Sequence, residues 1–239
     1  MLKQMVASAL FAGFAAGLFA ALLQFVFVEP LLIEAELYET GAKVHFAAPS
    51  TGHSHEQAST PVAAEAEPAP VPQSGDLQRH GWTVIFTALV HVGYALLLVA
   101  GFALGELRGQ RVTVRSGLIW GMAGFIAVQF APAVGLALEL PGMAAADLTG
   151  RQLWWAGTVV CTAGALWLIG FGQTWALWGA AVALLFLPHL IGAPEVVELT
   201  GPTPPELSAQ FVGRALGVGM AGWVVLGLLA ATIWRRAEP

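Results

Sequence analysis

Residues 4–28 read QMVASALFAGFAAGLFAALLQFVFV, and this stretch decides the fold class. Only Gln4, Ser8 and Gln24 interrupt its apolar and small side chains. An α-helix of about 20 apolar residues crosses the ~30 Å hydrocarbon core of a bilayer, whereas the apolar core of a signal peptide has about 7 to 15 residues. We therefore interpret residues 4–28 as a transmembrane helix that the mature protein retains.

Five more apolar stretches of the same kind follow along the chain. They cover approximately residues 82–104, 117–138, 152–170, 175–192 and 211–234. Of the 239 residues, 57% are hydrophobic and 10% are charged, compared with about 25% charged residues in a soluble domain. The sequence predicts an all-α integral membrane protein, a bundle of about six transmembrane helices in a single membrane domain that covers residues 1–239.

The distribution of charge predicts how these spans are oriented. Six spans place both termini on one side, and Lys and Arg are enriched in cytoplasmic loops. With the termini in the cytoplasm, the inner segments hold six basic and two acidic residues, while the outer segments hold four basic and thirteen acidic residues. The inner basic residues are Lys3, Arg108, Arg111, Arg115, Arg235 and Arg236. We predict a multi-pass protein with both termini in the cytoplasm.

One long segment separates the first two spans, and its composition changes halfway. Residues 29–46 mix apolar and acidic side chains and predict an ordered extension, with a short helix that stops at Gly41. Residues 47–76 are rich in Ala, Pro, Ser, Thr and Glu, so they cannot bury enough apolar surface to offset chain entropy. We predict that residues 47–76, called the arm below, are a flexible His/Pro/Ala-rich loop on the non-cytoplasmic side.

Histidines in and beside the arm are candidate metal ligands. The sequence GHSHE at residues 52–56 places two imidazoles next to a carboxylate. Neutral imidazole binds Co, Ni, Cu and Zn, and carboxylates can complete a mixed nitrogen and oxygen site. A solvated polar linker and a pH sensor are the alternatives for this segment. The metal candidates here are His45, His53, His55, Glu56 and His80.

Two other histidines belong to the predicted spans. His91 lies about ten residues into the second span, where an ionisable group is costly unless it is paired or hydrated, and this makes it a candidate metal ligand. Its alternative is a neutral histidine that hydrogen-bonds to a neighbouring helix. His189, near the outer end of the fifth span, is a further candidate, although an ionisable group near the membrane surface has a lower free-energy cost than one deep in a span.

Carboxylates gather where the first span leaves the membrane, at Glu29, Glu34, Glu36 and Glu39. Such a cluster at a pore mouth raises the local concentration of cations, and Glu36 and Glu39 are candidate metal ligands. A solvated acidic rim is the alternative. If the helix continues beyond Glu29, this residue shares a face with Glu36, although Pro30 favours a break.

Several residues predict contacts between helices. Arg79 and Arg151 lie at outer ends of spans, against the charge rule, and we expect each to pair with a loop carboxylate. Small residues spaced four apart let helix backbones approach closely in lipid. These spacings indicate either dense packing within one bundle or contacts in a homo-oligomer. The pairs are Gly13 with Gly17, Gly117 with Gly121 and Gly213 with Gly217.

Several classes of function lack the residues that they require. A net charge of -5 without a run of Lys or Arg argues against a nucleic-acid partner. The chain has no ATP-binding phosphate loop, nucleophile elbow, HExxH helix or dinucleotide fingerprint, and its single cysteine, Cys161, can form neither an intrachain disulfide nor a thiolate metal cluster. We predict that the protein is not an enzyme, has no permanently bound cofactor, and has the lipid bilayer as its main partner.

Five stretches of this chain occur in combination: a small-residue-rich first span, PLLIEAELYE at residues 30–39, the His-bearing loop that ends in Arg79, LPG at residues 140–142, and RQLWW at residues 151–155. In this combination the chain resembles the CbtA family of predicted cobalt transporter subunits. The resemblance implies a subunit of the cytoplasmic membrane of a bacterium that works with a small one-helix partner, CbtB, in cobalt uptake linked to cobalamin synthesis. By position, it points to Glu36, Glu39, Arg79, Arg151 and Trp155.

Two functions fit these observations. In the first, the arm captures a divalent metal ion, with cobalt preferred, and the ion passes to a site near His91 and the outer carboxylates before it crosses the bundle. In the second, an accessory membrane protein binds metal and delivers it to another permease. Mixed nitrogen and oxygen ligands suit cobalt, nickel and zinc alike, so the ligand types leave the metal open. A membrane enzyme of lipid or quinone chemistry has no recognisable acid/base or cofactor site here.

Overall fold

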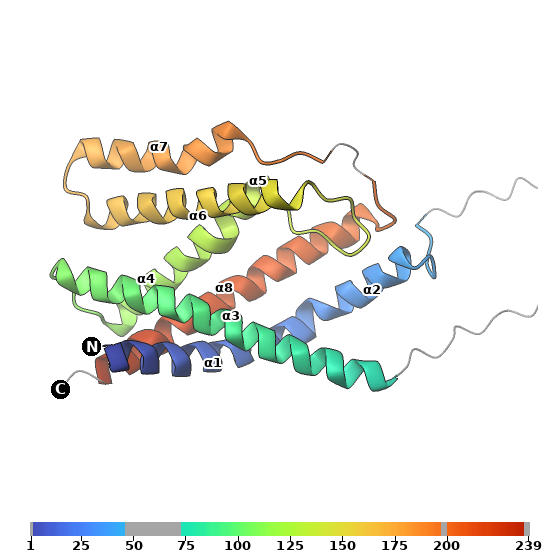
Figure 1. Cartoon of the computed structure of the whole chain (residues 1–239), viewed down its shortest axis with the longest axis horizontal. Helices are drawn as coiled ribbons and strands as arrows, with labels where there is room; N and C mark the ends of the chain where they lie inside the picture. The colour runs from blue at the N-terminus through green and yellow to red at the C-terminus, as the bar shows by residue number, and fades with distance from the viewer. Residues whose placement is uncertain (1, 46–72, 197–199, 237–239) are drawn as a thin grey trace, which may run out of the picture.

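The computed structural model describes residues 2–45, 73–196 and 200–236. Within these ranges every regular element is helical (Figure 1). Five helices are long and apolar enough to cross a membrane, and a sixth apolar helix, Trp175–Ile191, is shorter. These helices confirm the predicted helical membrane bundle. Three of the predicted metal ligands, His53, His55 and Glu56, lie outside the described residues.

The first span is followed directly by a short second helix. Helix α1 covers Leu2–Phe27 and α2 covers Glu29–Glu39. The break comes at Pro30, which lacks an N–H and whose ring clashes with the carbonyl four residues earlier in a continuous helix. Pro30 instead lies in the first turn of α2, where backbone N–H groups have no helical acceptor and a missing N–H costs nothing. The chain leaves α2 at Gly41 with φ +76°, as predicted for the end of the short helix.

The second span is longer than its apolar core. Helix α3 covers Gln73–Leu107, 35 residues, whereas the hydrophobic pattern predicts a span over 82–104. Its first four residues belong to the segment predicted to be a flexible arm, and residues 47–72 lie outside the described ranges. The extension carries the polar start of α3 beyond the apolar stretch, toward α2 (Figure 1).

Helices α1 and α3 pack in direct backbone contact. A Cβ atom added at Gly13 would lie 2.5 Å from the Cα of Val92, and one added at Gly17 would lie 2.5 Å from the Cα of Ala88. Only glycine permits this approach. The first predicted glycine pair therefore packs within the bundle.

The third span contains a π-helix. It consists of α4 (Val114–Phe125), the π-helical turn η1 (Ile126–Phe130) and α5 (Ala131–Gly135), and it matches the predicted span at 117–138 approximately. A π-helical turn closes i→i+5 hydrogen bonds and is most often found at functional sites. Here the N–H of Ala131 donates to the carbonyl of Ile126. The apolar pattern of residues 117–138 does not predict this irregularity.

The remaining helices form a hairpin and one long C-terminal span. Helices α6 (Leu148–Phe171) and α7 (Trp175–Ile191) pack antiparallel, and α8 covers Pro205–Arg236. The Asp147 carboxylate caps α6 by accepting from the N–H of Gly150 at 2.7 Å, which explains why the helix begins before the apolar core at residue 152.

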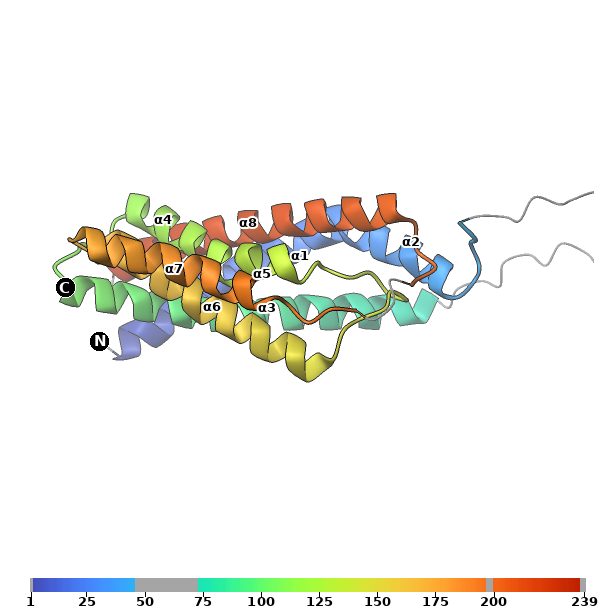
Figure 2. The ribbon, with the colours of Figure 1, turned by 90° about the horizontal axis from the view of Figure 1, so that it is seen from above.

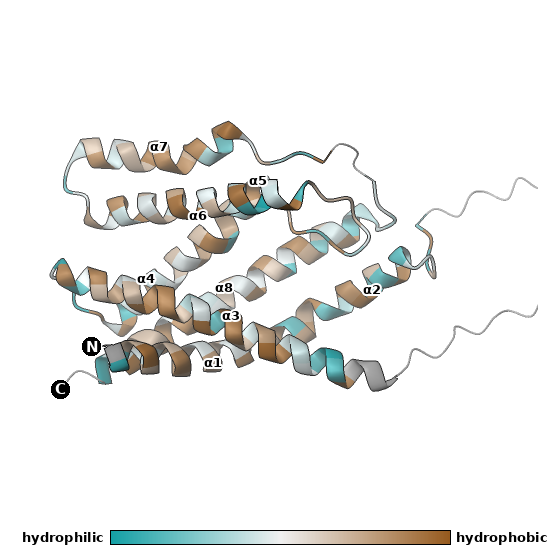
Figure 3. Ribbon diagram, in the orientation of Figure 1, coloured by the Kyte–Doolittle hydropathy of each residue, from teal (hydrophilic) through white to brown (hydrophobic). Residues whose placement is uncertain are grey.

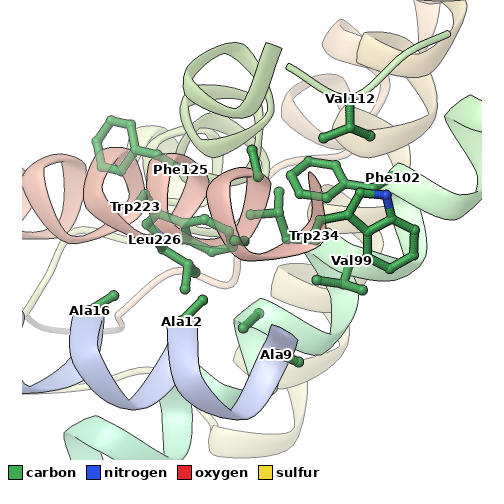
Figure 4. Packing of buried hydrophobic residues seen from close by; sticks show 14 of the residues in the cluster. Ala9, Ala12, Ala16, Val99, Phe102, Val112, Phe125, Trp223, Leu226 and Trp234 are labelled. Atoms are coloured by element: carbon green, nitrogen blue, oxygen red, sulfur yellow. The ribbon is translucent and has the colours of Figure 1, made fainter. Parts of the chain in front are cut away.

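The helices are arranged in two groups (Figures 1 and 2). Helices α1, α3, α4 and α8 pack together, and the α6–α7 hairpin lies beside them and is joined to them mainly through η1 and α5. In the larger group, alanines of α1 face the bulky side chains of α3 and α8, among them Phe102, Leu226 and Trp234 (Figure 4). Small residues on one helix thus admit large ones from its neighbours, which is how close packing is reached in lipid.

Both termini lie at the same end of the molecule. The Gln4 amide donates to the carbonyl of Trp234 at 3.1 Å, which joins the first turn of α1 to the last turn of α8. The α3–α4 loop and the α6–α7 turn lie at this end, and α2 lies at the opposite end (Figure 1). Polar residues gather toward the ends of the helices, as the hydropathy colouring shows (Figure 3). The end with the termini and the end with α2 are therefore joined by the five long apolar helices, with the shorter α7 beside α6.

Candidate functional site

The predicted metal ligands do not form a ready-made cage. Among the described residues, no group of three or more His, Cys, Asp or Glu side chains is placed to hold a metal ion. The described candidates instead lie in three regions, namely the end of the bundle formed by α2 and the start of α3, the middle of α3, and the last turn of α7. A metal site in this part of the chain must use other oxygen donors or ligands from a partner.

The first region is an ion-pair cluster between α2 and α3, formed by Glu29, Glu36, Arg79 and His80. The Arg79 guanidinium donates to Glu36 at 3.0 Å, and the His80 Nε2 lies 2.8 Å from a carboxylate oxygen of Glu29. Arg79 also lies 4.0 Å from Glu29, whose side chain is only 13% exposed. The predicted pairing of Arg79 is confirmed. A metal ion would have to displace Arg79 or His80 to reach these carboxylates.

Other charges at this end are paired as well. Arg151 pairs with Glu139 at 3.0 Å, which confirms the second predicted pairing, and Lys43 pairs with Glu34 at 3.2 Å. These contacts are partly or largely exposed, so each contributes about 0 to 1 kcal/mol of stability. They act mainly by orienting loops against the helices.

Two more candidates lie near the end of α2. Glu39 is exposed and packs its stem against the turn at 140–142, because a Cβ atom added at Gly142 would lie 3.1 Å from its Cβ and Cγ atoms. Gly142 has φ +77°, so glycine is favoured there both by conformation and by this contact. His45 is exposed and comes just after α2. The segment at 30–39 and the LPG turn therefore meet in space.

The second region centres on His91, which is 8% exposed and faces the junction of α1, α3 and α8. Its Nδ1 lies 2.8 Å from the carbonyl oxygen of Thr87. A carbonyl can only accept, so Nδ1 carries the proton and the Nε2 of the neutral ring has a free electron pair. That Nε2 faces Gly222, where an added Cβ would lie 3.0 Å away, and it has no hydrogen-bond partner within the described ranges.

His91 belongs to a larger polar cluster in the middle of the bundle. Tyr94 lies one turn further along α3, with its ring 5.8 Å from that of His91 and stacked on Trp223 of α8 at 4.6 Å. The side chain of Tyr94 also interacts with Gln129 of η1. We call His91, Tyr94, Gln129 and Trp223 the central polar cluster.

The central polar cluster contains two buried polar atoms without partners. Four such side-chain atoms occur in the described part of the chain, on Ser8, Gln129, Thr162 and Trp223. Two of them, Gln129 Oε1 and Trp223 Nε1, belong to this cluster. In lipid such atoms are costly and usually have a functional reason.

A line of polar groups joins the outer ion pairs to this cluster. His80, Thr87, His91 and Tyr94 recur at intervals of seven, four and three residues, so they lie on one face of α3. The Thr87 hydroxyl donates to the Gln24 amide oxygen of α1 at 3.3 Å, between the two regions. From His80 to His91 the helix rises about 16 Å, roughly half the thickness of the hydrocarbon core.

The third region is on the hairpin. His189 lies in the last turn of α7, with its ring 5.8 Å from that of Trp154 in an edge-to-face arrangement. It therefore belongs to a different helix pair from His91, and it is part of no group of three or more His, Cys, Asp or Glu side chains placed to hold a metal among the described residues.

A family model described as "Probable cobalt transporter subunit (CbtA)" matches residues 2–235, nearly the whole chain. The chain belongs to the CbtA family. No curated protein and no solved structure matches it. Cobalt is accordingly the expected transported substrate of this membrane-protein family.

The RQLWW stretch of this CbtA-family chain has a structural role. Trp154 Nε1 donates to the carbonyl of Pro188 in α7 at 3.0 Å, and Trp155 Nε1 donates to the carbonyl of Val128 in η1 at 3.2 Å. Pro132, four residues after Val128, has no N–H to donate an α-helical hydrogen bond to this carbonyl, so the Trp155 indole gives it a donor. The two indoles therefore join α6 to α7 and to the π-helix.

Sequence reasoning missed three members of the central polar cluster, Tyr94, Gln129 and Trp223. One signal was present: Gln129 is an amide inside an apolar span, three residues before Pro132. Polar residues beside a proline often mark an irregular transmembrane helix with a functional role. Tyr94 and Trp223 carry no such signal, because aromatic residues are common in membrane helices and only the packing of α3 against α8 brings these two together.

Proposed function

We propose that this chain is the membrane subunit of an uptake transporter for cobalt(II), or a similar divalent metal ion. The observation that supports the proposal most directly is the free Nε2 of His91, buried in the middle of the bundle with its electron pair fixed by the bond from Nδ1 to Thr87. Neutral imidazole is a preferred ligand for cobalt(II). A buried histidine without a protein partner at Nε2 is thus suited to bind a metal in transit.

The proposed route begins on the non-cytoplasmic side. The arm candidates His53, His55 and Glu56 collect ions, and Glu36 and Glu39 keep this end of the bundle acidic. An ion then passes Gln24 and Thr87 to reach His91. Since His80 is held by Glu29, its release from that carboxylate would provide an imidazole at the start of the route.

The orientation follows from the charges. The end that holds both termini carries Arg235 and Arg236 in the last turn of α8, and the opposite end carries the carboxylates of α2. We place the basic end in the cytoplasm of a bacterium, because cytoplasmic segments are enriched in Lys and Arg. The lipid bilayer surrounds the exposed apolar side chains.

A partner chain would complete the transporter. His91 offers one nitrogen, and the described residues offer no cage of acidic or histidine ligands around it. A small one-helix CbtB-type subunit with a His-bearing terminus would supply further ligands. A second copy of this chain is the other candidate. The pair Gly213 and Gly217 supports either partner, since a Cβ atom added at these positions meets nothing within 4 Å.

The second candidate function is metal binding without transport. The dispersed ligands favour it, because they allow capture at the outer end without a complete site in the membrane. Liposomes that hold a cobalt-sensitive dye separate the two functions. We expect cobalt to enter when the purified chain is reconstituted, alone or with the one-helix subunit, and to enter poorly with the His91→Ala variant. Binding without entry under both conditions would favour the accessory function.

A further inference from the structure

Two polar atoms of the central polar cluster face the same glycine-lined surface of α8. A Cβ atom added at Gly222 would lie 3.0 Å from His91 Nε2, and a Cβ atom added at Gly219 would overlap Gln129 Oε1. Positions 219 and 222 are three residues apart, so they are neighbours on one face of the helix, with Cβ positions about 5 to 6 Å apart. The two polar atoms therefore approach α8 one turn apart, from α3 and from η1.

Both atoms are electron-pair donors that lack a proton donor. Gln129 Oε1 is fully buried and accepts no hydrogen bond within the described ranges. His91 Nε2 has its free electron pair in the neutral ring, because Nδ1 donates to Thr87. One imidazole nitrogen and one amide oxygen that converge on the same surface are a suitable pair for a borderline cation such as Co²⁺.

The π-helix explains how the amide reaches this surface. One extra residue in a helical turn rotates every later side chain by about 100° relative to an uninterrupted α-helix. Gln129 lies within η1, and its oxygen contacts Gly219 of α8. The irregular turn thus directs the amide toward the bundle interior.

Tyr94 holds the two donors in place. Its ring contacts that of His91, stacks on Trp223 of α8, and its side chain interacts with Gln129. Since it meets both donors and is itself fixed by stacking, it acts as a positioning residue.

We infer that His91 Nε2 and Gln129 Oε1 together bind the transported cation on the Gly219–Gly222 surface of α8, with water or a partner in the remaining coordination positions. This inference rests on the proposed function and adds the second ligand. A site with only two donors from the chain binds loosely, which suits an ion that must also leave.

The test uses the full chain in lipid nanodiscs, in a His53→Ala/His55→Ala background that removes binding by the arm. Co²⁺ binding is measured by titration calorimetry and by the visible absorption of the bound ion. We expect His91→Ala and Gln129→Leu each to weaken binding by tenfold or more. Gly219→Ala, which removes no ligand but forces the Gln129 amide to move, should weaken binding similarly. Gly157→Ala in α6 is the matched control, because its Cβ meets nothing within 4 Å and α6 contributes no residue to the proposed site, and it should bind like the background protein.

The possible outcomes separate this inference from the proposed function. Loss of binding in His91→Ala together with normal binding in Gln129→Leu and Gly219→Ala would overturn the Gln129 ligand and leave His91 as the metal residue. Normal binding in His91→Ala would overturn both this inference and the proposed role of His91 in transport. If Gln129 Oε1 only holds a structural water, Gln129→Leu should keep its Co²⁺ affinity, and this result also contradicts the inference. Tyr94→Ala, which removes both the stacked ring and the interaction with Gln129, should change the absorption spectrum of the bound ion.

Discussion

His91 differs from the arm histidines in how the chain holds it. Its Nδ1 is fixed by the Thr87 carbonyl, and its ring is enclosed by α1, α3 and α8. His53 and His55 lie in a segment whose composition predicts no packed structure. An imidazole fixed within the bundle and the imidazoles of an arm predicted to be flexible should affect different steps of uptake, so substitutions at the two places should have different kinetic effects.

Substitution of His91 should lower the maximal rate of uptake. His91→Ala removes the nitrogen ligand without adding bulk, and His91→Gln keeps polarity with a poorer metal ligand. We expect both to reduce cobalt uptake at saturating metal by on the order of tenfold or more, since even the loss of a metal ligand's outer partner costs 10- to 100-fold. Uptake is measured in cells with protein levels matched by immunoblot. Normal uptake by both variants over the whole metal range would leave His91 as a packing residue.

Substitution of the arm histidines should instead change uptake at scarce metal. The variant His53→Ala/His55→Ala should require several times more cobalt for half-maximal uptake and should keep its maximal rate, because ions held by the arm raise the local ion concentration without forming the site in the membrane. Rates over a range of cobalt concentrations check this. A complete loss of uptake at saturation would place the obligatory site in the arm.

Among the elements, the π-helix and the hairpin depend on each other. Pro132 has no N–H to donate an α-helical hydrogen bond to the Val128 carbonyl, and Trp155 of α6 donates to that carbonyl. In the hydrocarbon core no water is present to replace such a donor. The RQLWW stretch thus stabilises the irregular turn that contains Gln129.

Trp155→Phe should therefore destabilise the protein. The variant keeps an aromatic ring but leaves the Val128 carbonyl without this donor, which costs about 1 to 3 kcal/mol. Thermal unfolding in detergent, followed by circular dichroism, should show a lower midpoint. Trp175→Phe is the matched control, because Trp175 is 85% exposed and its indole makes no hydrogen bond within the described ranges. Equal midpoints for the two variants would show that the indole bond contributes little.

The glycines of α1 and α3 allow a second test at the same scale. Gly13→Ala places a Cβ atom 2.5 Å from a backbone atom of α3, so the helices must separate and stability should fall by about 1 to 3 kcal/mol. Gly93→Ala is the control, since its Cβ meets nothing within 4 Å and alanine favours a helix by about 1 kcal/mol over glycine. The same unfolding measurement should therefore move in opposite directions for the two variants. A stable Gly13→Ala protein would contradict the tight α1–α3 packing.

For the whole molecule, the sequence predicted the helical membrane bundle well, because the length of an apolar stretch is a local property set by the thickness of the bilayer, although α7 is shorter than the other five apolar helices. It predicted that Arg79 and Arg151 pair with carboxylates, since an isolated charge at a helix end needs a counterion. It did not predict the start of α3 at residue 73, where the helix continues through polar residues, nor the π-helix. The sequence also did not predict the central polar cluster, because Gln129 meets Tyr94 only through the lateral packing of helices that are distant in sequence.

The orientation of the whole molecule gives the last prediction. Both termini lie at one end, and the arm joins α2 to α3 at the other, so labelling of the arm reports the orientation of the entire bundle. In a Cys161→Ala background, a Ser59→Cys variant should react with an impermeant thiol reagent in intact cells, after permeabilisation of an outer membrane if one is present. Gln110→Cys in the α3–α4 loop is the control and should react only after lysis, because it lies at the basic end that we place in the cytoplasm. The reverse pattern of labelling would show that the bundle has the opposite orientation. The acidic end of α2 would then face the cytoplasm, as an exit for metal instead of an entrance.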